Sequence, residues 1–266
     1  MIAGILHSGS GLGNQLHRYV ATRVLALDKG YDFSMVAPEN FKGKSFMNLD
    51  MGWKVGIPYT LEQPAGKIVP YHPDFKSWEE KTPYYNPEFN FIEDNTIIDG
   101  EFQDERYFEH RLDEISSWLQ TNRSWAENES TCLIGFRGGE FYTVPELGLP
   151  KPYYEQAIAK MREINPKMKF EVETDDPILA KQFFPDFKIV HDIEENWCKM
   201  RGYRYAIVAN SSFYILPRLL RHNHKYPKDY ENGKNLAVTI APLYWDRYNI
   251  RVWERPYNYY KAFTYI

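Results

Sequence analysis

The sequence of 266 residues has little cysteine, no long apolar run and no block of like charges. Its two cysteines, Cys132 and Cys198, match neither a metal-ligand spacing nor a disulfide framework, so we expect buried thiols in a reducing compartment or a neutral core. The start lacks the basic residues and the apolar run of a secretory signal, and no window approaches the roughly 18 apolar residues of a membrane span. These absences predict a soluble, cytoplasmic protein without a membrane span.

Charge is nearly balanced, with 32 Lys and Arg against 36 Asp and Glu, and 43% of the residues are hydrophobic. A balance of this kind, without a basic cluster, argues against nucleic acid as a partner. The length suits one large or two modest domains. Because residues 121–130 are polar, we place a linker there and predict domains at 1–125 and 126–266.

Predicted strands and helices alternate along most of the chain. A strand at residues 2–6 leads through a glycine-rich turn into a helix that ends at Gly30, and residues 33–90 predict only short elements. Further strands are predicted at 95–99, 132–136, 168–172, 188–190, 205–209 and 237–240, and helices at 108–119, 152–164, 177–184 and 212–220. This alternation predicts an α/β fold with a parallel sheet covered on both faces.

Small, charged and amide side chains directly follow several predicted strands. In open α/β sheets the ligand lies outside the carboxyl ends of the strands, so these residues are expected to gather at one edge. They are Gly11, Gly13, Asn14 and Gln15 after the first strand, Arg137, Gly138, Gly139 and Glu140 after the strand that ends at Phe136, Thr174, Asp175 and Asp176 at the end of the next strand, and Asn210, Ser211 and Ser212 after the strand that ends at Ala209.

Arg137 is the most informative of these residues. An arginine fork can hold a diphosphate with two parallel hydrogen bonds, and the glycines beside it permit a close approach, although a structural ion pair is the alternative. The glycine turn at 9–13 could present backbone amides to an anion at a helix N-terminus, or it is a plain tight turn.

The remaining polar residues each have two interpretations. Asp175 and Asp176 could accept hydrogen bonds from a guanine or a ribose, or cap the next helix. Asn210, Ser211 and Ser212 could donate hydrogen bonds to phosphate oxygens, or they could cap the helix that follows. The sequence has no Asp-x-Asp motif to hold a metal against a diphosphate, so we expect no metal and no cofactor, with Arg137 compensating the charge of the leaving group.

The chain resembles the inverting fucosyltransferases typified by bacterial α-1,2-fucosyltransferases (glycosyltransferase family 11), within the wider superfamily of GDP-fucose-dependent enzymes. Residues 11–16 resemble the family's opening Gly-Leu-Gly-Asn-Gln block, and residues 100–108 resemble its Gly-Tyr/Phe-x-Gln segment. The other matching blocks, in the same order, are residues 137–140, 152–158, 174–176, 207–213 and 240–245, the last of which ends on Trp245. The blocks span almost the whole chain.

The resemblance implies an α/β, GT-B-like, metal-independent glycosyltransferase with two Rossmann-like halves, which transfers L-fucose from GDP-fucose to a hydroxyl of a glycan acceptor. The first half would be the acceptor side, and the second would hold the GDP-sugar, with a C-terminal tail able to fold back on the first. Arg137 would neutralise the departing diphosphate, and Asn14 would approach the diphosphate or the sugar from the first half. Glu140 is a candidate general base, with Glu105 and His17 weaker ones. The implied donor-binding residues are Gly11, Gly13, Gln15, Gly138, Asp175, Asp176, Asn210, Ser211, Ser212 and Phe213.

Four departures from the family pattern leave alternatives open. Gly135 stands in place of a His, Gly138 in place of a second Arg, Glu140 in place of an Asp, and residues 214–217 in place of a Trp pair. Transfer of another GDP-linked sugar, a catalytically silent nucleotide-sugar or glycan-binding protein, and a purely structural domain are therefore the competing hypotheses.

Overall fold

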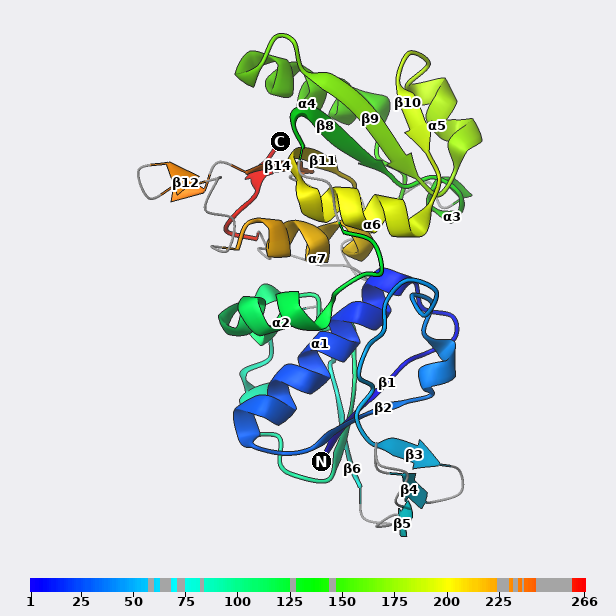
Figure 1. The fold of residues 1–266 in the computed structure, drawn as a ribbon, viewed down its shortest axis with the longest axis vertical. Coiled ribbons are helices and arrows are strands. Elements are labelled where there is room, and N and C mark those ends of the chain that lie inside the picture. Colours follow the sequence, from blue (N-terminus) through cyan, green and yellow to red (C-terminus); the bar gives the residue numbers. More distant parts are fainter. Residues whose placement is uncertain are drawn as a thin grey trace. The chain divides into compact units, whose positions relative to one another are not determined.

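The computed structural model describes residues 1–56, 60–62, 68–70, 75–81, 84–124, 128–143, 147–223, 230–231, 234–235, 237–242 and 260–266. The chain forms two compact units, Met1–Gln120 and Thr121–Ile266 (Figure 1). Their boundary falls at the start of the polar segment 121–130 predicted as a linker. Trp245 and most of the C-terminal tail lie outside the described residues. Within the described ranges, no helix has the length and apolar character needed to cross a bilayer.

The first unit is built on a four-stranded parallel sheet in the order β2-β1-β7-β6. These strands are β1 (Ile2–Ile5), β2 (Phe33–Val36), β6 (Lys76–Glu79) and β7 (Thr96–Asp99). Helix α1 (Leu12–Lys29) connects β1 to β2, and Gly30 ends it with φ of 67°, a left-handed conformation that glycine adopts readily. The strand, glycine turn and helix predicted at the start of the chain are confirmed.

Shorter elements complete this unit. They are η1 (Pro38–Asn40), η2 (Pro87–Phe91), η3 (Glu105–Tyr107), η4 (Glu109–Arg111), α2 (Leu112–Trp118) and an antiparallel sheet of β3 (Lys54–Gly56), β4 (Thr60–Glu62) and β5 (Ile68–Pro70). The helix predicted over 108–119 is wrong in its first part. Phe108 has φ of −151° and ψ of −2°, which is not helical, so 3₁₀ turns precede α2.

The second unit is built on a six-stranded sheet in the order β10-β9-β8-β11-β14-β15, and its pairings are parallel. The strands are β8 (Asn128–Phe136), β9 (Lys169–Thr174), β10 (Lys188–Val190), β11 (Tyr203–Val208), β14 (Val238–Ala241) and β15 (Thr264–Tyr265). A separate antiparallel pair is formed by β12 (Tyr230–Glu231) and β13 (Lys234–Asn235). Both cysteines are free and buried, as predicted.

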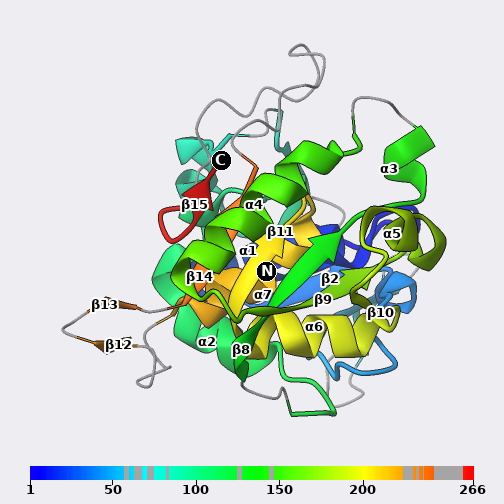
Figure 2. The same cartoon turned by 90° about the horizontal axis from the view of Figure 1, so that it is seen from above.

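Helices cover both faces of this sheet, with α4 (Lys151–Ile164) and α5 (Pro177–Phe183) on one face and α6 (Ile193–Gly202) and α7 (Ser212–Arg221) on the other (Figure 1). Figure 2 shows α4 in front of β11, with which it is in contact. A short helix, α3 (Glu140–Thr143), follows β8. The α/β class with parallel sheets is therefore confirmed in both units.

Helix α6 is absent from the sequence-based assignment. Its start carried a signal, because Asp192 caps the helix by accepting a hydrogen bond from the Glu195 amide at 2.8 Å. Few apolar residues mark its buried face, which includes the charged Lys199 and Arg201. Hydrophobic periodicity therefore could not reveal it.

Candidate active site

In the second unit, the loops after β8, β9 and β11 meet at the carboxyl edge of the sheet. Phe136 at the end of β8 lies beside Thr174 of β9, and the Ala209 amide donates to the Gly135 carbonyl at 3.0 Å. The chain runs outward from β8 through β9 to β10 and then returns to β11 on the other side of β8. The strand order thus reverses between β8 and β11, and ligands of open α/β sheets bind at such a point.

Arg137 directly follows β8 and lies between two carboxylates. Its Nη1 donates to Asp175 Oδ2, and its Nη2 lies 3.2 Å from Glu140 Oε1. The guanidinium carbon is 4.7 Å from the centre of the Phe141 ring. The buried Nε has no hydrogen-bond partner among the described residues. The guanidinium is thus oriented by its neighbours, and these two contacts use two of its five N–H groups.

The two aspartates after β9 hold the loop after β8. Asp175 Oδ1 accepts from the Gly138 amide at 2.8 Å, and Asp176 Oδ2 accepts from the Gly139 amide at 3.1 Å. Asp176 also caps α5 by accepting from the Leu179 amide at 3.0 Å, and these backbone hydrogen bonds lower the pKa of its carboxyl. Of the roles left open by the sequence, Asp176 performs capping. Contact of either aspartate with a guanine stays a prediction.

Gly138 is required by this arrangement. A Cβ at this position would lie 2.4 Å from the Cβ of Asp176, so any larger residue would displace the aspartate. A second arginine at this place would therefore be incompatible with the observed position of Asp176.

The loop after β11 leads into the N-terminus of α7. Asn210 is buried, and its Nδ2 lies 3.4 Å from the Leu147 carbonyl. Ser211 occupies the N-cap position with extended backbone, although its side chain makes no capping hydrogen bond to the described residues. Ser212 and Phe213 are half-buried in the first turn of α7, where the helix dipole favours an anion. Their contact with phosphate stays a prediction.

Tyr214 is a structural residue of this edge that the sequence reasoning missed. Its hydroxyl, whose pKa is raised by burial, is 3.1 Å from the carbonyl oxygens of both Phe136 and Glu173. A Cβ on Gly135 would lie 2.9 Å from the Tyr214 ring. A side chain at position 135 would therefore clash with the Tyr214 ring.

Tyr153 of α4 binds the same edge from the opposite face. Its hydroxyl donates to the Val208 carbonyl at 2.7 Å and is 3.4 Å from the Ile240 carbonyl. Two buried tyrosines therefore hold the carboxyl ends of β8, β9, β11 and β14, and the loops that follow start from a fixed frame.

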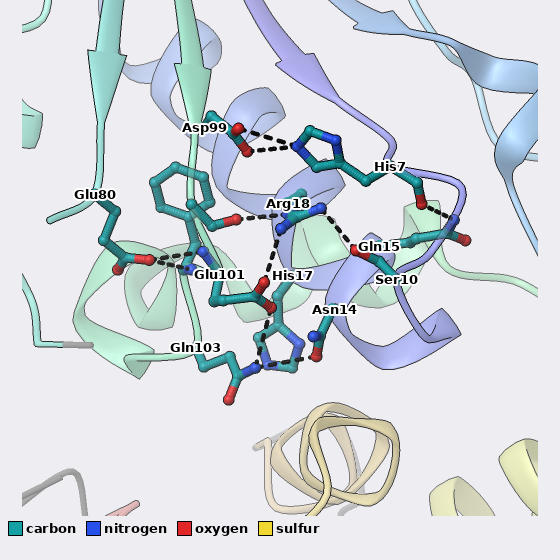
Figure 3. A network of polar contacts seen from close by, with 12 residues as sticks. His7, Ser10, Asn14, Gln15, His17, Arg18, Glu80, Asp99, Glu101 and Gln103 are labelled. Atoms are coloured by element: carbon teal, nitrogen blue, oxygen red, sulfur yellow. Dashed lines mark hydrogen bonds and ion pairs between the residues drawn. The ribbon is translucent and has the colours of Figure 1, made fainter. Parts of the chain in front are cut away.

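In the first unit, the carboxyl edge of β1 and β7 carries a second polar cluster (Figure 3). Gln15 is fully buried and holds the turn after β1, because its Nε2 donates to the carbonyls of His7 and Asn40 at 3.2 and 2.8 Å, and its Oε1 accepts from the Lys42 amide at 2.9 Å. All three hydrogen bonds are to backbone groups, so Gln15 has a structural role here, and its contact with the donor stays a prediction. Asn14 is half-buried, and its Oδ1 accepts from Gln103 Nε2 at 3.0 Å.

The glycines of the turn differ in their surroundings. Gly11 is exposed, and a Cβ there would meet no atom within 4 Å, whereas Gly13 is buried in α1. Of the weaker candidate bases, His17 is fully buried with Nδ1 2.8 Å from the Gly13 carbonyl, and Glu105 begins η3. The catalytic role predicted for Asn14 and the donor contacts of Gly11 and Gly13 stay predictions.

Arg18 was missed by the sequence reasoning because it looks like an ordinary residue of α1. Its side chain is nearly buried and donates to the Gly100 carbonyl at 2.6 Å, to Ser10 Oγ at 2.9 Å and to Glu101 Oε1 at 2.7 Å (Figure 3). It thereby connects the turn after β1 to the segment after β7. No group of three or more His, Cys, Asp or Glu side chains within the described ranges could hold a metal ion.

No protein-family model and no curated protein matches the sequence. Among solved structures, the chain is similar to the NodZ α-1,6-fucosyltransferase soaked with GDP-fucose, at 15% identity and a TM-score of 0.44, over 82% of this chain and 92% of that one. It is also similar to the fucosyltransferase NodZ from Bradyrhizobium, at 14% identity and a TM-score of 0.42, over 82% and 93% of the two chains.

Proposed function

We propose that this protein is an inverting glycosyltransferase of the GT-B type that transfers L-fucose from GDP-fucose to a hydroxyl of a glycan acceptor without a metal ion. Support comes from the ordered sequence blocks that resemble bacterial α-1,2-fucosyltransferases. The blocks at residues 11–16, 100–108, 137–140, 174–176 and 207–213 lie at, or follow, the carboxyl ends of β1, β7, β8, β9 and β11. In this proposal the second unit binds the nucleotide sugar, and the first is the acceptor side.

The observation that carries the proposal is the position of Arg137 at the reversal of strand order, where Asp175 and Glu140 use two of its five N–H groups. Departure of GDP places negative charge on the β-phosphate, and a pre-oriented guanidinium stabilises that charge without reorganisation. In the proposed complex the N-terminus of α7, with Ser211, Ser212 and Phe213, contacts the phosphates. Together these groups supply the positive potential that a metal ion supplies in other transferases.

The first experiment measures thermal stability of the whole chain with GDP, UDP, CDP or ADP, each with and without EDTA. Ligand at about 100 times its Kd adds about 2.7 kcal/mol to the free energy of unfolding. We expect a shift with GDP that EDTA leaves unchanged. A preference for UDP, or no shift with any nucleotide, would overturn the GDP-sugar assignment.

The second experiment measures release of GDP and formation of a fucosylated product from GDP-fucose in wild type, Arg137→Ala and Arg137→Lys. We expect kcat of Arg137→Ala to be lower than that of wild type by a factor of about 10²–10³, the range found on removing one preorganised hydrogen-bond donor. Lysine, a point charge without the planar fork, should recover only part of this loss. Activity with a different GDP-sugar but not with GDP-fucose would favour the alternative donor. Nucleotide binding without transfer or hydrolysis would favour a silent binding protein.

A further inference from the structure

His7 and Asp99 form a hydrogen-bonded pair at the carboxyl edge of the sheet in the first unit. Asp99 is the last residue of β7, and His7 lies in the turn that follows β1. The two strands are parallel neighbours, with Gly4 opposite Ile98, so their carboxyl ends lie side by side. The chain passes from β1 to β2 on one side, while β7 pairs with β6 on the other. The pair therefore stands at the carboxyl ends of two neighbouring parallel strands, the edge of the sheet at which open α/β folds bind ligands.

The geometry of the pair defines which nitrogen is basic. His7 Nε2 is 3.0 Å from both carboxylate oxygens of Asp99 (Figure 3). An ionised carboxylate only accepts hydrogen bonds, so in the neutral ring the proton resides on Nε2 and the lone pair on Nδ1. The side chains are 44% and 37% exposed, which leaves the pair open to a substrate.

The backbone that carries the pair is held by buried side chains. Gln15 donates to the His7 carbonyl at 3.2 Å, and Arg18 bonds both Ser10 in the same turn and Gly100 directly after Asp99. Arg18 also pairs with Glu101, so both segments are anchored to one helix, α1. Rigid elements thus present an exposed imidazole whose orientation a carboxylate determines, which is the usual arrangement of a general base.

We propose that His7 is the general base of the transfer and that Asp99 positions it, an inference that rests on the fucosyltransferase function proposed above. The acceptor oxygen forms a bond to C1 of fucose, and the bond from C1 to the β-phosphate oxygen breaks, with its electron pair leaving on GDP. The acceptor's hydroxyl proton passes to His7 Nδ1. Asp99 stabilises the imidazolium that results, as a carboxylate does for a catalytic histidine.

The chain contains a matched control for this assignment. His110 and Asp28 form another exposed pair in the same unit, with Nε2 2.8 Å from Oδ2, and His110 is 50% exposed. Asp28 lies near the C-terminal end of α1 and His110 in η4, away from the carboxyl ends of the strands. Both pairs are exposed His–Asp hydrogen bonds, but they differ in their place in the fold, and Arg111 also binds the Asp28 carboxylate, with its Nε 2.8 Å from Oδ1.

The test compares wild type, His7→Gln, Asp99→Asn and His110→Gln with GDP-fucose and a set of methyl galactoside, N-acetylglucosaminide and mannoside acceptors. General-base catalysis contributes about 10²–10⁴ in rate, so we expect kcat of His7→Gln to fall within that range. Its thermal shift with GDP should equal that of wild type. The kcat of Asp99→Asn should fall by a smaller factor. The double variant should have nearly the same kcat as His7→Gln, because the two residues act as a unit.

Sodium azide distinguishes a lost base from a damaged site. Azide is anionic at neutral pH and attacks C1 without a proton to remove, so His7→Gln should form fucosyl azide at the wild-type rate. Transfer by His7→Gln equal to that of His110→Gln would overturn the role of His7 and leave the fucosyltransferase proposal intact. Wild type without GDP binding or transfer would overturn both. If His7→Gln folds poorly, Asp99→Asn with the azide measurement decides by the same criteria.

Discussion

The carboxylate of Asp175 binds the guanidinium of Arg137 across the carboxyl ends of the neighbouring strands β9 and β8. The same carboxylate accepts a hydrogen bond from the amide of Gly138, so one side chain holds both the cation and the glycine beside it. Arg137 is therefore presented as an oriented fork at the edge of the sheet. Its other neighbour, the exposed Glu140, makes a looser contact, with Oε1 3.2 Å from Nη2.

Glu140→Gln should tighten binding of GDP. Glu140 is 77% exposed and lies 3.2 Å from Arg137 Nη2, so its charge opposes that of an incoming diphosphate. Exposed pairs of this kind are worth about 0–1 kcal/mol, so we expect the Kd for GDP to fall by about two- to fivefold, as calorimetry would measure. Because His7 is proposed as the base, kcat should change little. A loss of about a hundredfold in kcat would instead identify Glu140 as the base.

Gly138→Ala should destabilise the protein, whereas Gly11→Ala should not. The new methyl at 138 would meet Asp176, which caps α5, and overpacking of this kind costs about 1–3 kcal/mol. The methyl at 11 would meet nothing, and Gly11 has φ of −66°, which any residue adopts. Chemical denaturation measures both. A Gly11→Ala protein of normal stability with weakened GDP-fucose binding would support the predicted contact of Gly11 with the donor.

Glu173 should make the protein less stable as the pH rises through the weakly acidic range. Burial raises the pKa of this carboxyl from 4.5 to about 7, and the nearby Lys199 only partly offsets burial. The folded state therefore binds the proton more tightly than the unfolded state. The stabilisation that the tighter proton binding provides is fully present below pH 4.5 and is lost by about pH 7. The shift corresponds to about 3 kcal/mol at 1.36 kcal/mol per pKa unit.

Glu173→Gln isolates this effect. As pH rises from 4.5 to 7, the free energy of unfolding of wild type should fall relative to that of the variant. Urea denaturation at a series of pH values gives this difference. Parallel curves for the two proteins would contradict the assignment. Glu171→Gln should show the opposite sign at lower pH, because the ion pairs of Glu171 with Lys188 and Lys199 outweigh its burial and lower its pKa.

Arg218 should be essential for the stability of the second unit. It is fully buried, and its guanidinium donates to Thr239 Oγ1 at 2.9 Å and to the carbonyls of Met200, Tyr203, Arg204 and Val238 at 3.0, 2.6, 3.1 and 3.2 Å. Removing the donor leaves several buried acceptors unpaired, at about 1–3 kcal/mol each. Arg218→Met should therefore lower the free energy of unfolding by about 3 kcal/mol or more. Arg123 is 64% exposed and lies 3.5 Å from Glu194, so Arg123→Met should change it by about 1 kcal/mol at most.

The order of strands and helices was readable in the sequence wherever one element carries its own signals. The start of the chain shows this, since the apolar run of β1, the helical spacing of α1 and the stop at Gly30 are all local features. Sequence blocks also located Arg137 and Asp175 on loops at strand ends. Helix α6 was missed because its buried face includes charged residues, whose burial depends on partners elsewhere in the chain.

What these loop residues do was decided by the tertiary structure. His7 and Asp99 are 92 residues apart in the chain, and Arg137 and Asp175 are 38 apart, so only the pairing of parallel strands brings each pair together. The same is true of Tyr214, which is distant from Gly135 in the sequence and fills the space beside it in the fold. Local periodicity determines which segments become strands and helices, whereas hydrogen-bond partners depend on which strands become neighbours in the sheet.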